Sequence, residues 1–238
     1  MAQNFRLKTF LFTLERSFMR TIVLTFDDTC RSHLEIAVPV LKQYGFGATF
    51  FASFPDVWYQ DIPDAHLRPS ECAELYKQGF EVGNHTKNHP DLRQLKDEEC
   101  RKEISFLNDL LSENGIPSPV SFAYPGGPYA ENSAHLLPEY GIRFARTTEH
   151  ALWTKETDPL RIPCYSINSG KQKINFQEGL DLLGDREDAA LVLLYHGVPD
   201  LAHPQCSTDE ELFKNQMKYL SENNYRVVSM SDYGQQII

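Results

Sequence analysis

The sequence of 238 residues has few positive charges and no long hydrophobic run, and both absences exclude partners. No apolar stretch approaches the ~20 residues that a membrane-spanning helix needs, so membrane insertion is not expected. Lys and Arg number 23 against 33 Asp and Glu, which gives a formal net charge of -10. A surface this acidic repels the phosphates of nucleic acids and anionic lipids, so neither is an expected partner.

The sequence also lacks the cysteine spacings that are typical of disulfide-bonded or zinc-binding domains. Five cysteines are an odd number and no two form a CxxC pair, so we expect neither a disulfide framework nor a structural zinc knuckle. Free thiols suit a reducing compartment, and residues 1–20 hold no apolar stretch long enough for a signal peptide. We therefore expect a cytoplasmic protein.

No Pro/Ser-rich linker or change in composition divides the main part of the chain. We interpret residues 19–238 as a single domain and residues 1–18 as an arm or upstream extension, with Met19 as an alternative natural start. A hydrophobic fraction of 41% and a charged fraction of 24% are typical of a globular domain, and the length is ample for one packed core.

Short apolar runs alternate with helical stripes along this domain. Strands are predicted at 22–26, 48–52, 80–83, 120–124, 143–147, 162–167, 191–195 and 226–230. Helices are predicted at 34–44, 70–78, 97–113, 133–140 and 176–183, and a last helix runs from a capping box of Thr208 and Glu211 to Glu222. Repeated βα units with short links imply parallel strands and right-handed crossovers, and seven or eight units in this length predict an α/β barrel.

Side chains suited to catalysis follow four predicted strands, at the end of a βα barrel where active sites lie. They are Asp27 and Asp28, His85 and His89, Tyr124–Gly127, and His196. An isolated Asp pair is most simply a helix cap or a turn. Two adjacent carboxylates that leave a buried strand point to different sides, however, so one is able to bind a metal while the other faces a substrate. A cation would also relieve the repulsion between them.

His85 and His89 form an HxxxH pair, which alone is a common accident. If residues 85–89 form a helical turn, both imidazoles lie on one face, and together with one carboxylate they leave open positions, the pattern of catalytic zinc. His196 follows a fully apolar strand. It either satisfies a backbone carbonyl or, beside a metal, serves as a general acid.

The motifs that contain these residues resemble, in sequence and in order, those of the polysaccharide deacetylase family, the NodB homology group also called carbohydrate esterase family 4. They are Thr25–Asp28, His85–His89, Tyr124–Gly127 and Leu194–Gly197. The resemblance covers roughly residues 20–235. It implies a distorted (β/α) barrel of about seven parallel strands, metal-dependent hydrolysis of N-acetyl groups on amino sugars, and an acetylated saccharide as substrate.

The resemblance also implies roles for single residues. Asp28, His85 and His89 resemble the metal triad, with Zn²⁺ as the first expectation and Co²⁺, Ni²⁺ or Mn²⁺ as alternatives. Asp27 resembles the catalytic base and His196 the acid that protonates the leaving amine. The backbone N–H of Tyr124 resembles the oxyanion donor, and Leu194, Tyr124 and Pro125 are the expected substrate-binding residues.

The sequence departs from the family pattern at several positions. Thr29 stands where a glycine usually follows the Asp pair, and Ala123 stands where the third motif normally has the arginine that orients the base. Arg161 is a candidate replacement for that arginine, with an ordinary surface arginine as the equal alternative. Asp158 is the candidate for the acidic residue that tunes His196.

Two other functions remain open at this point. The same site would serve an amidase or esterase that acts on a non-sugar acyl substrate, because carbonyl hydrolysis does not depend on what lies beyond the scissile bond. Ala123 also motivates a degenerate barrel that binds a glycan without turnover. The segment Pro199–Cys206, which contains His203, is interpreted as a surface loop, and no role is assigned to His33, His66, His135 and His150. Aromatic residues at candidate substrate loops, each explained more simply by core packing, are Trp58, Tyr59, Tyr129, Trp153 and Tyr165.

Overall fold

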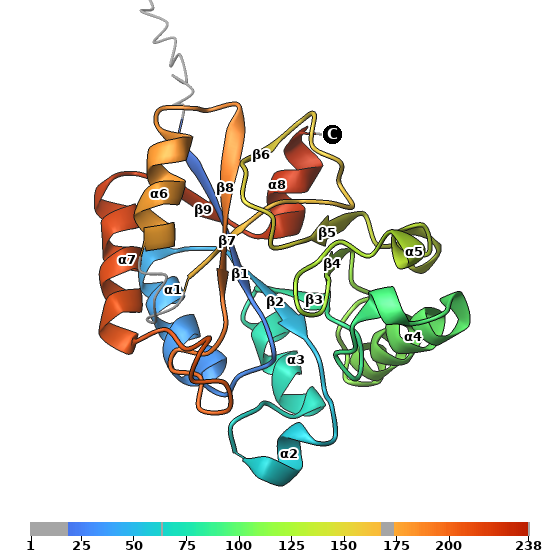
Figure 1. Cartoon of the computed structure of the whole chain (residues 1–238). Helices are drawn as coiled ribbons and strands as arrows, with labels where there is room; N and C mark the ends of the chain where they lie inside the picture. The colour runs from blue at the N-terminus through green and yellow to red at the C-terminus, as the bar shows by residue number, and fades with distance from the viewer. Residues whose placement is uncertain (1–18, 63, 168–173, 238) are drawn as a thin grey trace, which may run out of the picture.

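The computed structural model describes residues 19–62, 64–167 and 174–237, so the arm interpreted at 1–18 lies outside the described residues. The strands are β1 (Thr21–Phe26), β2 (Thr49–Ala52), β3 (Glu81–Asn84), β4 (Ser121–Ala123), β5 (Phe144–Arg146), β6 (Trp153–Thr154), β7 (Tyr165–Ser166), β8 (Ala189–Tyr195) and β9 (Arg226–Val228) (Figure 1). The α-helices are α1 (Val38–Tyr44), α2 (Trp58–Asp61), α3 (Pro69–Lys77), α4 (Asp97–Glu113), α5 (Glu131–Ala134), α6 (Ile174–Leu183), α7 (Glu210–Glu222) and α8 (Met230–Ile237).

The sheet curls into a distorted barrel. Neighbouring strands follow the order β5-β4-β3-β2-β1-β8, and every pair along this path is parallel. On the far side β7 pairs with β8 in parallel, and Ile162, just before β7, forms a parallel bridge with Arg146 of β5. Seven parallel strands thus surround the core, joined weakly at β7, and the predicted distorted (β/α) barrel is confirmed.

Two further strands extend the sheet at the amino end of the barrel. β9 pairs with the first three residues of β1, and β6 pairs antiparallel with the first two residues of β8. Both β1 and β8 are therefore bonded on two sides and every residue in them is buried, which explains why β8 is entirely apolar and β1 is interrupted only by threonines. Helices α1, α6 and α7 cluster beside these two strands (Figure 1). The loops after the carboxyl ends of the strands remain free to build a site.

Most of the predicted helices are found, and their departures have local causes. α4 has the predicted bounds, and its stripe of Cys100, Ile104, Leu107 and Leu111 is buried. The segment predicted at 34–44 begins as a π-helical turn over His33–Ala37, and α1 begins at Val38, because Pro39 lacks an N–H and fits only a first helical turn.

Three details of the sequence interpretation were wrong. The N-cap of α7 is Asp209, whose side chain accepts the N–H of Leu212, whereas the hydroxyl of Thr208 donates to the carbonyl of Ile167. The segment predicted as one helix at 133–140 is α5 followed by a 3₁₀ turn, Leu137–Tyr140. The strand predicted to reach residue 230 ends at Val228, and α8 follows it.

All five cysteines are free, as predicted. No helix in the part of the chain that the structure describes is long and apolar enough to cross a membrane.

Candidate metal centre

Asp27 and Asp28 follow β1, where the chain turns sharply. The backbone φ is 71° at Asp28 and 48° at Thr29, a left-handed conformation that costs an L-residue roughly 1–2 kcal/mol. The carbonyl of Asp28 lies 2.8 Å from Nδ1 of His66 and accepts its proton, and the Thr29 hydroxyl donates to the carbonyl of Ser53 at 2.9 Å. These bonds hold the turn without the expected glycine. His66, which the sequence left without a role, thus fixes the backbone of Asp28.

His85 and His89 lie in an irregular loop after β3 and not in the helical turn considered from their spacing. Thr86 and His89 have positive φ values of 64° and 53°. The N–H of Thr86 donates to Oδ1 of Asn84 at 2.8 Å, and the N–H of His89 donates to the hydroxyl of Thr86 at 3.1 Å. The bent loop brings the two imidazole rings edge to face, with their centroids 4.7 Å apart.

Asp28, His85 and His89 converge as a candidate metal triad. Nε2 of each histidine lies 3.5 Å from Oδ1 of Asp28, and one ligand atom from each residue lies within 4.8 Å of the others. Ligand atoms held about 2.0–2.2 Å from one tetrahedral zinc ion are separated by roughly 3.3–3.6 Å. Nδ1 of His85 lies 2.7 Å from the carbonyl of Ala123 and must donate to it, so Nε2 keeps its lone pair for a metal. The residues therefore fit a divalent cation.

The electrostatics of the triad also favour a cation. Burial raises the pKa of Asp28 to about 6, helped by the charge of Asp27 and opposed by His196. Burial lowers the pKa of His85 to about 3, so this imidazole is neutral at ordinary pH. Within the described residues, Oδ1 of Asp28 is buried with no hydrogen-bond donor. A buried carboxylate without a donor is costly, and a bound cation would remove that cost.

Asp27 is paired with an arginine that the sequence analysis did not identify. Nη2 of Arg146, in β5, lies 2.7 and 2.5 Å from the two carboxylate oxygens of Asp27, and both side chains are buried. Burial alone would raise the pKa of Asp27, but the charge and hydrogen bonds of the Arg146 guanidinium bring it below its ordinary value. Asp27 is thus held ionised beside the triad, 3.7 Å from Nε2 of His85.

Arg161 does not orient the base, which corrects the sequence interpretation. Its guanidinium contacts both carboxylate oxygens of Glu149, at 2.6 to 3.1 Å, and both side chains are about half exposed. The missing motif arginine is replaced from β5, by Arg146. Asp158 likewise serves a local turn, since its carboxylate accepts the N–H of Leu160, whereas Asp200 is the buried carboxylate that interacts electrostatically with His196.

His196 directly follows the carboxyl end of β8. Its Nε2 is 3.7 Å from Oδ2 of Asp28, and its side chain is 18% exposed, so the ring meets both the buried carboxylates and the cavity. Nε2 of His33 lies 3.2 Å from the backbone carbonyl of His196 and donates to it. His33, another histidine without a predicted role, therefore positions the backbone of the candidate acid.

Tyr124 and Pro125 are not placed as the sequence analysis expected. The N–H of Tyr124 donates to the carbonyl of Arg146 at 3.1 Å, extending the β4–β5 ladder, so it is not available as an oxyanion donor. The Tyr124 side chain is buried with its hydroxyl on the carbonyl of Leu160, and Pro125 is also buried. Gly126 and Gly127, one step further along the chain, are the members of this motif that line the cavity.

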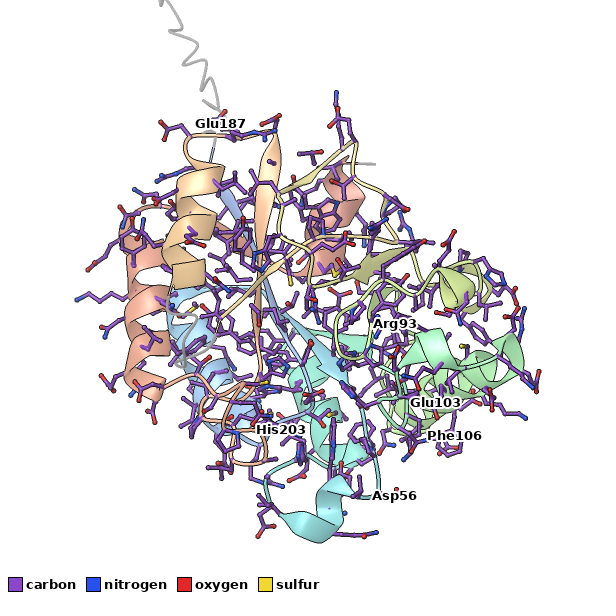
Figure 2. The ribbon with its side chains drawn as sticks, in the orientation of Figure 1. Asp56, Arg93, Glu103, Phe106, Glu187 and His203 are labelled. Carbon is purple, nitrogen blue, oxygen red and sulfur yellow. The ribbon has the colours of Figure 1, made fainter. Side chains whose placement is uncertain are left out.

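One cavity of about 370 Å³ unites the candidate residues. Leu194 lines it as expected, and so do Trp58 and three residues of the Pro199–Cys206 loop, which is therefore part of the site and not an ordinary surface loop. Figure 2 shows His203 of that loop at the carboxyl end of β8, opposite Glu187 at the other end. The lining residues are Asp27, Asp28, Trp58, His85, His89, Gly126, Gly127, Thr148, Ser166, Leu194, His196, His203, Gln205 and Cys206.

Comparison with known sequences agrees with the resemblance of the motifs. A family model described as polysaccharide deacetylase matches residues 17–145, more than half of the chain. The chain is 26% identical to YxkH of Bacillus subtilis over 130 residues, 55% of this chain and 45% of that protein. It is 25% identical to the poly-beta-1,6-N-acetyl-D-glucosamine N-deacetylase of Staphylococcus aureus over 174 residues, 68% of this chain and 60% of that enzyme. It thus spans less than two thirds of both relatives.

Solved structures share the fold at low sequence identity. The Bc1960 peptidoglycan N-acetylglucosamine deacetylase aligns with a TM-score of 0.62 and 20% identity, over 89% of this chain and 86% of that one. A CE4 family pseudoenzyme from Bacillus anthracis aligns with a TM-score of 0.61 and 16% identity, over 90% of this chain and 65% of that one. These likenesses support the barrel of mostly parallel strands, and the match to the family model identifies the sequence: the chain belongs to the polysaccharide deacetylase family.

Proposed function

We propose that this chain is a metal-dependent hydrolase that removes acyl groups, foremost acetyl, from the nitrogen of an amino sugar. The observation that carries the proposal is the convergence of three kinds of group in one cavity. These are a neutral-imidazole and carboxylate triad suited to a metal, an ionised base paired with Arg146, and the imidazole of His196. Metal-assisted amide hydrolysis uses a Lewis acid, a base for the attacking water and an acid for the leaving nitrogen, and these three groups are able to supply them.

The triad suits a divalent ion with two nitrogen ligands and one oxygen ligand. Zinc is the first expectation, and Co²⁺, Ni²⁺ or Mn²⁺ would accept the same donors. Such an ion, held by Asp28, His85 and His89, would supply Lewis acidity toward the acyl carbonyl and the attacking water.

The protein's own residues divide the proton transfers between two sides of the site. Asp27 removes a proton from the attacking water as its oxygen bonds to the acyl carbon, and Arg146 keeps Asp27 ionised and oriented. His196 gives a proton to the sugar nitrogen as the C–N bond breaks, so acetate and an amine leave. Asp27 and His196 flank the same carboxylate, Asp28, which places the base and the acid around one reacting carbonyl.

The N–H of Gly126 is the oxyanion donor in this proposal, in place of that of Tyr124. Gly126 lines the cavity, and among the described residues its N–H has no backbone acceptor, whereas the N–H groups of Tyr124 and Gly127 are both occupied. A free N–H at this edge is suited to stabilise charge on the carbonyl oxygen during attack. Leu194 supplies an apolar contact for the acyl methyl group.

An amino sugar is the proposed substrate because similar proteins are named as deacetylases of N-acetylglucosamine units. One relative is named as a poly-beta-1,6-N-acetyl-D-glucosamine N-deacetylase, and one structural neighbour as a peptidoglycan N-acetylglucosamine deacetylase. The pairing of Arg146 with Asp27 argues against a degenerate barrel, since that interpretation rested on the missing motif arginine at Ala123.

The proposal is tested by acetate release from the zinc-loaded protein. The substrates are N-acetylglucosamine oligomers, O-acetylated xylan and simple acetamides, and we expect release from the first. The Asp27→Asn variant should keep its zinc and lose turnover, whereas the His85→Ala variant should lose both. Full zinc occupancy without acetate release from any N-acetylated sugar would overturn the proposal, and preferential release from acetamides would favour the non-sugar amidase.

A further inference from the structure

The loops that follow β2 and β8 meet above the carboxyl end of β1. In the sheet β1 lies between these two strands, so a contact between the two loops spans the end of β1. The ring of Trp58, after β2, lies 5.7 Å from the ring of His203, after β8, and the His66 ring lies 4.6 and 6.0 Å from them. Figure 2 shows Asp56, two residues before Trp58, and His203 at this same end of the barrel. The rings of Trp58, His66 and His203 form the aromatic wall of the cavity.

Hydrogen bonds fix both sides of the aromatic wall to the segment that follows β1. On the β2 side, the N–H of Leu67 donates to the carbonyl of Thr29 at 2.7 Å. On the β8 side, the hydroxyl of Ser32 donates to the carbonyl of Pro199 at 2.9 Å and accepts the N–H of Val198 at 2.8 Å. The wall is therefore part of the folded barrel, and no ligand is needed to order it.

The ring of His203 is held at the mouth of the cavity by a buried carboxylate. Oδ1 of Asp200, a residue that is 3% exposed, accepts the N–H groups of Ala202 and His203 at 3.0 and 2.7 Å. Oδ2 of Asp200 lies 3.6 Å from Nδ1 of His203, and this carboxylate raises the pKa of the imidazole. The His203 side chain is 29% exposed, whereas His66 is fully buried. The aromatic wall thus rises from the core to the mouth.

The aromatic wall stands directly beside the candidate metal triad. The Trp58 ring lies 5.7 Å from the ring of His89, and Trp58 and His203 line the same cavity of about 370 Å³ as Asp28. Rings whose centroids are this close are in contact, so no sugar unit fits between the wall and the triad. A saccharide whose acyl group reaches the triad therefore extends only away from β1.

We propose that the chain acts on a terminal unit of a saccharide, or on a single amino sugar, and that the aromatic wall excludes internal units of a longer saccharide. The proposal rests on the proposed function and narrows its substrate class. An internal unit carries a neighbour on both sides, and one neighbour would have to occupy the space that Trp58 and His203 fill. A terminal unit ends in a hydroxyl, for which the imidazole of His203 is a suitable hydrogen-bond partner.

The test locates the free amines in the products of β-1,4- and β-1,6-linked tetramers of N-acetylglucosamine. The zinc-loaded protein is incubated with each tetramer, the products are then labelled at the reducing end, and tandem mass spectrometry assigns the deacetylated unit. His203→Ala and Trp58→Ala are the test variants, and zinc analysis and circular dichroism show that each is loaded and folded. Leu201→Ala is the matched control, because Leu201 is in the same loop as His203, is 62% exposed and does not line the cavity.

We expect each tetramer to lose at most one acetyl group, from one terminal unit. At equal concentrations of N-acetyl groups, a long soluble polymer should release acetate at least about tenfold more slowly than a tetramer, because it has fewer ends. His203→Ala and Trp58→Ala should place free amines in internal units as well, and Leu201→Ala should keep the terminal pattern. Internal amines in the products of the unmodified protein, or an unchanged terminal pattern in both test variants, would overturn the proposal.

Failure of this inference is distinguishable from failure of the proposed function. Acetate release from internal units by the unmodified protein would leave the hydrolase and remove the exclusion. If no saccharide loses acetate, titration calorimetry of the zinc-loaded protein with the long polymer decides, because its stoichiometry counts the binding positions per polymer chain. One protein per polymer chain would support a terminal site without turnover. Several proteins per polymer chain, or no binding of any saccharide, would overturn it.

Discussion

Glu81 at the amino end of β3 and Asp28 beyond the carboxyl end of β1 are both carboxylates of the barrel, yet their surroundings differ. Glu81 accepts hydrogen bonds from the hydroxyls of Thr49 and Ser121, both at 2.6 Å, and from the N–H of Ser231 at 3.0 Å. Asp28 has an oxygen without a donor among the described residues, and burial raises its pKa to about 6. The amino end is arranged for stability, and the carboxyl end keeps polar groups unsatisfied for a ligand.

The backbone conformation differs between the two ends of the barrel in the same way. Four of the five non-glycine residues with positive φ in the described part of the chain are at the site: Asp28, Thr29, Thr86 and His89. Strained residues persist only where their surroundings fix them. Here His66 donates to the carbonyl of Asp28, and the side chains of Asn84 and Thr86 accept the N–H groups of Thr86 and His89. In the described part of the chain, the strained residues are thus concentrated at the carboxyl end of the barrel, beside the candidate site.

The largest expected effect comes from replacing one carboxylate at each end of the barrel by the corresponding amide. Asp28→Asn should abolish zinc binding and reduce kcat/KM by about a thousandfold or more, because a metal ligand is lost. The same change should raise the free energy of unfolding of the metal-free protein at pH 7 by about 1–2 kcal/mol, since it removes a buried charge without a donor. Glu81→Gln should lower that free energy by about 1–3 kcal/mol by unpairing buried donors, and should leave zinc binding in place.

Urea denaturation and zinc analysis of both variants check this prediction. The sign of the stability change decides it, because two destabilised variants would mean that both ends serve stability. For Asp28 the stabilising change should be smaller at pH 4 than at pH 7. Its folded pKa lies above its unfolded value, so the cost of its charge appears only as the pH rises from about 4 through 6.

The next effect concerns two arginines of the carboxyl end. Arg146→Met should reduce kcat about a hundredfold or more with zinc retained, because Asp27 loses the charge that keeps its pKa low. The acidic limb of the pH–rate profile should therefore move to higher pH. Arg161→Met should leave that limb in place, since Arg161 pairs with Glu149. A shift of the limb in the Arg161 variant, and not in the Arg146 variant, would restore the role first predicted for Arg161.

A third effect is the pH dependence of metal affinity. A proton on Asp28 competes with a metal, so the apparent zinc affinity should fall about tenfold for each pH unit below 6. His85 should not add to the slope in this range, because burial lowers its pKa to about 3. Competition with a chromophoric chelator between pH 5 and 7.5 measures the slope. An affinity that is flat below pH 6 would mean that Asp28 is not a ligand.

The sequence predicted the parts of the site that are continuous along the chain. Asp27 and Asp28, the HxxxH pair and His196 each follow a strand whose apolar run is plain, so the parallel topology suffices to bring them to one end. Arg146 was missed, although it is a charged residue near the end of the strand predicted at 143–147, where the other site residues also lie. His33 and His66 carried no signal, because each acts through a backbone carbonyl of a distant residue.

The fold, like the site, was predicted where the sequence pattern is continuous and missed where it is not. Long buried strands such as β8 and the amphipathic α4 were predicted with nearly correct bounds, since burial on two faces or on one face leaves a clear pattern. The two-residue strand β6 has too few residues to show any period and was not predicted, and β7 covers only two residues of the strand predicted at 162–167; the pairing with β8 places both. The expectation that the N–H of Tyr124 is an oxyanion donor failed because only the hydrogen bond to the carbonyl of Arg146, which the sequence does not reveal, shows that this N–H is occupied.

The smallest expected effect concerns how the barrel supports the loop of His85 and His89. Glu103 of α4, labelled in Figure 2, accepts the N–H and the side-chain amide of Asn88, both at 2.8 Å, one residue before His89. Glu103→Gln keeps one acceptor and loses the charge, so zinc should bind about three- to tenfold more weakly while thermal stability changes little. Glu98→Gln is the control, because Glu98 pairs with exposed Lys102 on the same helix and not with the loop of His85 and His89. Equal zinc affinities in the two variants would show that the strained loop needs no support from α4.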